Sequence, residues 1–334
     1  MLPSSSISFR CIGKGNCGSI WASDGDTTVS SDAIKREDMN PGRSVRNDYE
    51  THQRIIDAFS NTSTTMPHLV PECRALIEQS DSKWWEEMSH RFPKRLDHCT
   101  SLVTERIPRI PRPGRDYLVD LFCPPSRKEF TKSNRADEDC LIRAYLGRRR
   151  RRTGPTKSAL QLFSLRNYPL HIDQMEQLQL DTLAYANAMA DALAVMHWAA
   201  KVDASDVEFV LAPPRKPGLP TSFKSTGLGE HVIWILDFDC CKPITMDIAG
   251  VEQACHAFFL NDPYYPRPYS TAIEDQDLWE GFRIRFLATS YRLLGAQSPY
   301  ETLPLLLMDK IEECAMDRLR RKREIMEREK RDQT

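Results

Sequence analysis

Three glycines near the N-terminus are spaced as G-x-G-x-x-G, at Gly13, Gly15 and Gly18. Because glycine has no side chain, the backbone of such a turn can approach a ligand closely and turn its amides toward phosphate oxygens. The spacing alone is weak, since short glycine patterns recur by chance and often mark plain turns. Here Ile20 follows in a β-type run, which favours a strand–turn–strand hairpin over a dinucleotide-binding turn that opens a helix.

A lysine that could reach the same phosphates follows in Ala33-Ile34-Lys35, which is typical of a short strand. In this role Lys35 would contact the α and β phosphates of a nucleotide. Glu50, on a helix predicted over residues 44–59, is the expected ion-pair partner of Lys35, and Asp48 is its rival on the same helix. An exposed strand lysine and a solvated helix carboxylate are the plain alternatives.

An apolar run then leads into a proline-rich linker. In this run Thr104, Glu105 and Ile107 are the residues expected to offer backbone N–H and C=O groups to a nucleotide base. The alternative is an ordinary core strand.

Four acidic residues follow two apolar segments of the second half of the chain. Asp203 lies on a predicted loop between a buried helix (174–200) and a strand, where a carboxylate can accept a proton from a hydroxyl. Glu208 lies five residues later, and Asp237 and Asp239 follow the apolar strand 232–236. Hard oxygen ligands of this kind suit Mg²⁺. Each acid is also common as a cap or turn residue, so the shared order of the motifs carries the prediction.

The surrounding pattern predicts an α+β protein in two parts. A β-rich part is expected over residues 1–107 and a helical part over residues 108–302, joined at the proline-rich stretch that begins at Pro108. A charged C-terminal helix is expected over 303–334. The predicted strands cover residues 9–12, 20–22, 33–34, 68–77, 101–107, 207–211 and 232–236.

A basic segment interrupts the helical part near residues 127–160. Its five consecutive arginines, Arg148–Arg152, repel one another and are expected on an exposed, mobile insertion that could contact an anionic partner. A nuclear role is an alternative suggested by this run and by Arg318–Arg323, although short basic runs are more often solvated faces.

Composition excludes several classes of protein. The 46 Lys and Arg residues balance 47 Asp and Glu residues to a net charge of −1, so no bulk affinity for nucleic acid or membranes is expected. We find no apolar run of the roughly 20 residues that a membrane helix needs, and no signal peptide is apparent. The ten cysteines form no C-x-x-C pair, which predicts reduced thiols, a cytoplasmic location and no zinc.

These motifs resemble the protein-kinase-like superfamily. Gly13–Gly18 is similar to its nucleotide-binding loop, Lys35 to its third-strand lysine, Asp203 to its catalytic aspartate and Asp237 to its metal-binding aspartate. The resemblance implies a two-lobed fold, with a small β-rich lobe and a larger helical lobe, that binds ATP and Mg²⁺.

The chain also departs from the protein-kinase pattern. No arginine precedes Asp203, Glu208 stands where kinases carry asparagine, Asp239 replaces the glycine of D-F-G, and no A-P-E motif follows. These features look more like the aminoglycoside and choline phosphotransferase branch. The stretches 203–211, 236–239 and 261–268 are similar to a fungal family of unknown function whose members are often labelled zinc finger proteins.

Two functions follow from the resemblance. The first is an ATP- and Mg²⁺-dependent phosphotransferase acting on a hydroxyl of an unknown small molecule or protein. The second is a catalytically inactive, pseudokinase-like scaffold, which the departures favour. The fold alone does not separate the two.

Overall fold

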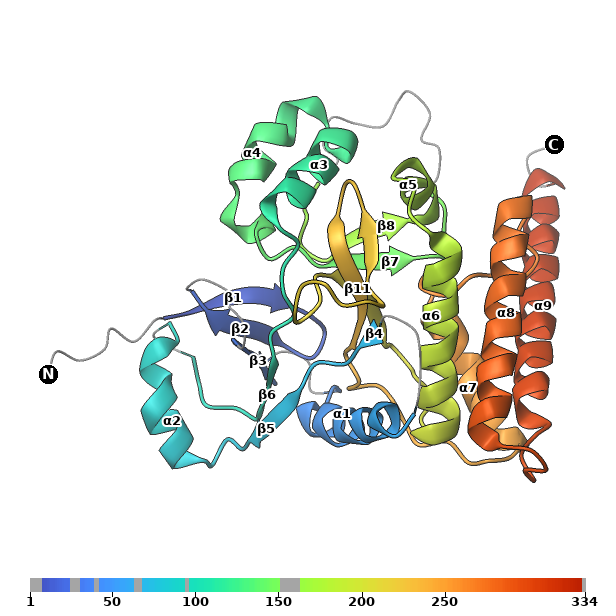
Figure 1. Ribbon diagram of the computed structural model, residues 1–334, viewed down its shortest axis with the longest axis horizontal. Helices are drawn as coiled ribbons and strands as arrows, with labels where there is room; N and C mark the ends of the chain where they lie inside the picture. The colour runs from blue at the N-terminus through green and yellow to red at the C-terminus, as the bar shows by residue number, and fades with distance from the viewer. Residues whose placement is uncertain are drawn as a thin grey trace, which may run out of the picture.

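A five-stranded antiparallel sheet forms the N-terminal part of the computed structural model, which describes residues 8–24, 31–38, 42–62, 68–93, 96–150 and 163–331. Its strand order is β1-β2-β3-β6-β5, and Lys35 lies on the central strand β3 (Figure 1). The strands are β1 (Phe9–Lys14), β2 (Ser19–Ser23), β3 (Asp32–Arg36), β5 (Cys73–Ile77) and β6 (Ser101–Glu105). The helical part follows, so the predicted α+β fold is confirmed, while the residue boundaries of its parts stay predictions.

Each face of this sheet is covered by one helix. Helix α2 (Ser82–Met88) places Trp85 in an aromatic cluster with Phe9, Trp21 and Phe92. Helix α1 (Val45–Ser60) covers the other face and begins at Ser44, whose side chain accepts a hydrogen bond from the amide of Asn47.

The buried stripe of α1 includes an acidic residue. It consists of Val45, Asp48, Thr51, His52, Ile55 and Ala58. The apolar residues Tyr49, Ile56 and Phe59 are only partly buried. The helix is therefore turned so that Asp48 faces the sheet. This orientation decides which carboxylate of α1 contacts Lys35.

A second sheet is formed mainly by strands of the C-terminal part of the chain. Its order is β10-β11-β9-β7-β8, and β4 (His68–Leu69) pairs with β11 in parallel. The strands are β7 (Ile142–Tyr145), β8 (Tyr168–His171), β9 (Glu208–Ala212), β10 (Phe223–Ser225) and β11 (Gly229–Leu236). Expected strand 68–77 is interrupted at Pro71, so that β4 joins this sheet and β5 joins the first. The segment predicted as a basic insertion contributes β7 to the same sheet.

Helices form the outer layer of the C-terminal part (Figure 1). They are α3 (Arg112–Phe122), α4 (Lys128–Ser133), α5 (Ile172–Gln177), α6 (Thr182–Ala194), α7 (Ile248–Leu260), α8 (Ile273–Leu294) and α9 (Leu303–Arg331). Expected helix 174–200 is divided: Gln179 has a positive φ, Asp181 caps α6, and a π-helical turn covers Val195–Ala199. No helix in the described part of the chain is both long and apolar enough to cross a membrane.

The described arginines of the basic run are paired rather than free. Arg148 contacts Asp262, Arg149 contacts Glu176 and Asp275, and Arg150 contacts Asp173. Arg148 and Arg150 are exposed and Arg149 is partly exposed, in agreement with the expected exposure. Acids of neighbouring elements neutralise these arginines, and the mobility of the segment stays a prediction. Arg151 and Arg152 lie outside the described residues.

Stability is expected to fall in acid because of a histidine at the centre of the helical layer. The ring of His197 lies against Trp198 and Phe286, and burial lowers its pKa to about 4. Between that value and its ordinary pKa the unfolded chain binds more protons than the folded one, so stability falls as pH falls through this window.

From this histidine alone we expect a loss of about 2 kcal/mol in the free energy of unfolding between pH 7 and pH 5. In urea unfolding, the free energy of unfolding of His197→Leu should depend less steeply on pH than that of wild type. His90 is exposed, so His90→Leu should keep the wild-type pH dependence. Equal slopes for all three proteins would contradict this explanation.

Candidate nucleotide site

A cavity of about 450 Å³ lies between the two sheets. It is lined by most of the residues that the sequence singled out: Gly13, Gly15, Gly18, Ile20, Ala33, Lys35, Thr104, Glu105, Ile107, Glu208, Asp237 and Asp239. Glu50 and Asp203 are not among the lining residues. The volume falls in the range of small-molecule sites in proteins.

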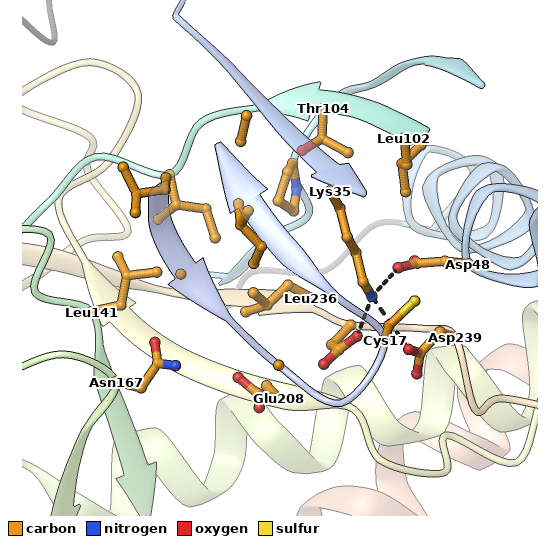
Figure 2. Close-up of a pocket in the computed structure, with 18 of the residues that line it drawn as sticks. Cys17, Lys35, Asp48, Leu102, Thr104, Leu141, Asn167, Glu208, Leu236 and Asp239 are labelled. Atoms are coloured by element: carbon orange, nitrogen blue, oxygen red, sulfur yellow. Dashed lines mark hydrogen bonds and ion pairs between the residues drawn. The ribbon is translucent and has the colours of Figure 1, made fainter. Parts of the chain in front are cut away.

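The glycine turn connects β1 and β2 and lines this cavity. The amide of Gly15 donates to the carbonyl of Gly18 at 2.9 Å, which closes the turn. The amides of Asn16, Cys17 and Gly18 have no acceptor among the described residues. Such successive free amides can bind an anion. Cys17 lies beside Lys35 and Asp239 (Figure 2), and burial raises the pKa of its thiol to about 12.

Lys35 is the centre of an ion-pair cluster. Its ammonium lies 2.6 Å from Asp48, 2.5 Å from Asp237 and 3.5 Å from Asp239 (Figure 2). Although burial opposes its charge, these carboxylates raise the pKa of Lys35 well above its usual value. The expected partner Glu50 is wrong, because Glu50 lies on the exposed side of α1 and Asp48 on the buried side.

Asp237 lies at the end of β11, at the same edge of the second sheet as Glu208. The register pairs Leu236 with Glu208, which brings the two acids to this edge. Asp237 has a φ of 69°, an uncommon conformation for a residue with a side chain, of the kind that concentrates at functional sites. Burial raises the pKa of Asp237, with Asp239 adding to the effect and Lys35 opposing it.

Glu208 is paired with an arginine that sequence reasoning missed. Arg143 lies on β7, next to β9, and its guanidinium donates to the Glu208 carboxylate. Burial raises the pKa of Glu208 to about 7, although Arg143 opposes the shift. No local motif around Arg143 identifies it, since the pair depends on how β7 and β9 align.

Asp239 is likewise paired. Its side chain is 1 % exposed and accepts from Arg43 at 2.8 Å, and the same Arg43 nitrogen donates to Asp206 at 2.7 Å. Arg43 lies just before α1, and both it and Asp206 line the cavity. Asp206, Asp239 and Cys240 form the one group of potential metal ligands found among the described residues.

Asp203 lies outside the cavity and serves the loop instead. It is 4 % exposed, and its carboxylate accepts hydrogen bonds from the amides of Lys242 and Ser205 and from the side chain of Gln253. The predicted catalytic position of Asp203 is therefore not reproduced by this geometry. Asp206, three residues later, occupies the cavity wall.

The end of the cavity away from Lys35 is lined by both apolar and charged side chains. Leu141 and Asn167 lie at this end, and Leu236 lies between them and Lys35 (Figure 2). The amide of Ile107 has no acceptor among the described residues, so it is free to donate to a ligand. The Glu105 carboxylate accepts a hydrogen bond from Arg215 at 2.6 Å, so it is not free for a ligand.

Comparisons with known proteins give short or distant matches. A family model described as "Zinc finger protein" matches residues 233–298, about a fifth of the chain. That stretch includes Asp237, Asp239 and Asn261, on which the resemblance to that family partly rested. No curated protein sequence matches the chain.

The solved structures that match include kinase domains of PknI from Mycobacterium tuberculosis. One double mutant is 13 % identical with a TM-score of 0.31 and covers 92 % of this chain and 98 % of its own. A second is 13 % identical with a TM-score of 0.32, covering 93 % and 100 %. The two-part α+β fold rests on the strand order and the element order of the chain itself.

Proposed function

We propose that this cavity binds ATP with Mg²⁺ and that the protein is a kinase-like phosphotransferase for an unknown hydroxyl acceptor. The observation that carries the proposal is the contact of Lys35 with both Asp48 and Asp237, directly beneath a glycine turn with free amides. The base would lie at the Thr104–Ile107 end and the phosphates at Lys35. In this arrangement the protein acts mainly by positioning and charge neutralisation.

The carboxylates fit a magnesium ion in their chemistry. One oxygen of Asp237 contacts Lys35, and the other has no donor among the described residues. Asp237 would hold the ion, with Asp239 and Glu208 as the nearby acids. Mg²⁺ bound there would neutralise phosphate charge. The raised pKa of Asp237 reflects burial and the neighbouring acids, and a cation among such carboxylates would relieve their repulsion.

A binding scaffold without phosphoryl transfer is the second candidate. It is favoured by the hydrogen bonds that hold Asp203 away from the cavity and by the arginine that already neutralises Glu208. Both candidates share the nucleotide site, so nucleotide binding is the first property to test.

Asp237→Asn is expected to weaken binding of ATP in the presence of Mg²⁺ by tenfold or more, about 1.4 kcal/mol. The measurement is the increase in melting temperature across an ATP titration, since a ligand of the native state must stabilise it. Asp120→Asn, on α3 and outside the cavity, is the control and should match wild type. Equal ATP responses of wild type and Asp237→Asn would contradict the assignment of Asp237.

A further inference from the structure

Arg43 occupies the place that a cation would take between two carboxylates of the cavity. The ligand atoms of Asp206, Asp239 and Cys240 lie within 4.8 Å of one another, close enough to surround one ion. Instead of an ion, one nitrogen of Arg43 contacts Asp206 at 2.7 Å and Asp239 at 2.8 Å. The guanidinium thus already supplies the positive charge that these acids require.

The position of Arg43 is held from several sides. Next to it, Ser44 caps α1, and Asn47 in the first turn donates to the carbonyls of Asp239 and Cys241. On the other side, the amide of Asp206 donates to Asn261 at 2.5 Å, and the same Asn261 binds the carbonyl of Ala204. Both ends of the bridge are therefore anchored to buried or capped structure, and Arg43 is preorganised between them.

The charge balance agrees with a single additional cation. Five carboxylates are linked by direct contacts to only three cationic side chains. The acids are Asp48, Asp206, Glu208, Asp237 and Asp239, and the cations are Lys35, Arg43 and Arg143. With every group ionised the formal charge of the cluster is −2, the charge that one divalent cation balances. Asp237, which contacts Lys35 through one oxygen only, is the acid with room for it.

We infer that Arg43 is a built-in cation that excludes a divalent metal ion from Asp206 and Asp239, so that the site takes one metal ion per nucleotide. The metal count per nucleotide rests on the proposed function, whereas the exclusion itself does not. A divalent ion and a guanidinium cannot both occupy the space between these carboxylates. Removing the guanidinium should leave two acids and a thiol around a vacant position.

The test is a titration with Mn²⁺ alone, followed by calorimetry or by the paramagnetic signal of free Mn²⁺. Arg43→Gln should gain a Mn²⁺ site at least tenfold tighter than any in wild type. Arg43→Lys, which keeps the positive charge, should not gain it, and Arg43→Gln combined with Asp239→Asn should lose it again. Arg46→Gln removes an exposed arginine in the first turn of α1, paired with Glu78, and should behave as wild type.

Two outcomes would overturn the inference. The first is a Mn²⁺ affinity of folded Arg43→Gln equal to that of wild type. The second, which needs no variant, is binding of two Mn²⁺ ions per ATP by the wild-type protein. If the wild-type protein binds no ATP while the Arg43→Gln variant gains the Mn²⁺ site, the proposed function is contradicted. The role of Arg43 in excluding the metal would still stand.

Discussion

Lys35→Met is expected to lower the free energy of unfolding by about 3–5 kcal/mol, the usual cost of removing one partner from a buried ion-pair network. The variant leaves Asp48, Asp237 and Asp239 without the ammonium that contacts all three. Asp48 and Asp239 are almost fully buried, so water cannot take the place of the missing ammonium. Denaturant unfolding measures the loss, and exposed Lys83→Met is the control.

Adding Asp48→Asn to Lys35→Met should restore part of the lost stability, because it removes one of the three repelling charges while keeping a hydrogen-bonding side chain. A Lys35→Met protein within about 1 kcal/mol of wild type would show that the cluster is not the buried network described here. Such a result would also remove the geometric basis for phosphate binding by Lys35.

Gly18→Ala is expected to destabilise the protein by about 3 kcal/mol through a clash with the backbone. A Cβ at position 18 would lie 1.8 Å from the carbonyl oxygen of Arg36 and 2.8 Å from the carboxylate of Asp38. That carboxylate also binds the amide of Ser19 at 2.8 Å, so the start of β2 must move to relieve the clash.

Gly15→Ala is the matched control in the same turn. A Cβ at position 15 meets nothing within 4 Å, so the stability of Gly15→Ala should equal that of wild type. Thermal unfolding of the two variants compares them directly. Similar melting temperatures for Gly18→Ala and wild type would mean that the turn does not pack against β3 as described.

The sequence predicted the features that depend on local pattern. The glycine turn, the strand lysine and the acid that ends β11 all line the cavity, because each is set by a few adjacent residues. The choice between Asp48 and Glu50 depended on the phase of one helix. Packing of α1 against the sheet selects the phase that buries Asp48.

The remaining site residues depend on contacts distant in sequence. Arg143 meets Glu208 because β7 and β9 are neighbours, and Asp206 faces the cavity because Asn261 holds its loop. Asp203 and Asp206 are both acids on one short loop, and its hydrogen bonds decide which one faces the cavity. A single sequence carries no pattern that links these residues across 55 positions or more.

The most direct test of the nucleotide site is a calorimetric titration of the wild-type protein with ATP in the presence of Mg²⁺. The cavity, the free amides of the glycine turn and the Lys35 cluster predict a saturable heat with one ATP per chain. The same titration in the presence of a metal chelator should show weaker binding, since the acids at the phosphate end would then lack their cation. No heat at millimolar ATP with Mg²⁺ would contradict the nucleotide site and, with it, the proposed phosphotransferase.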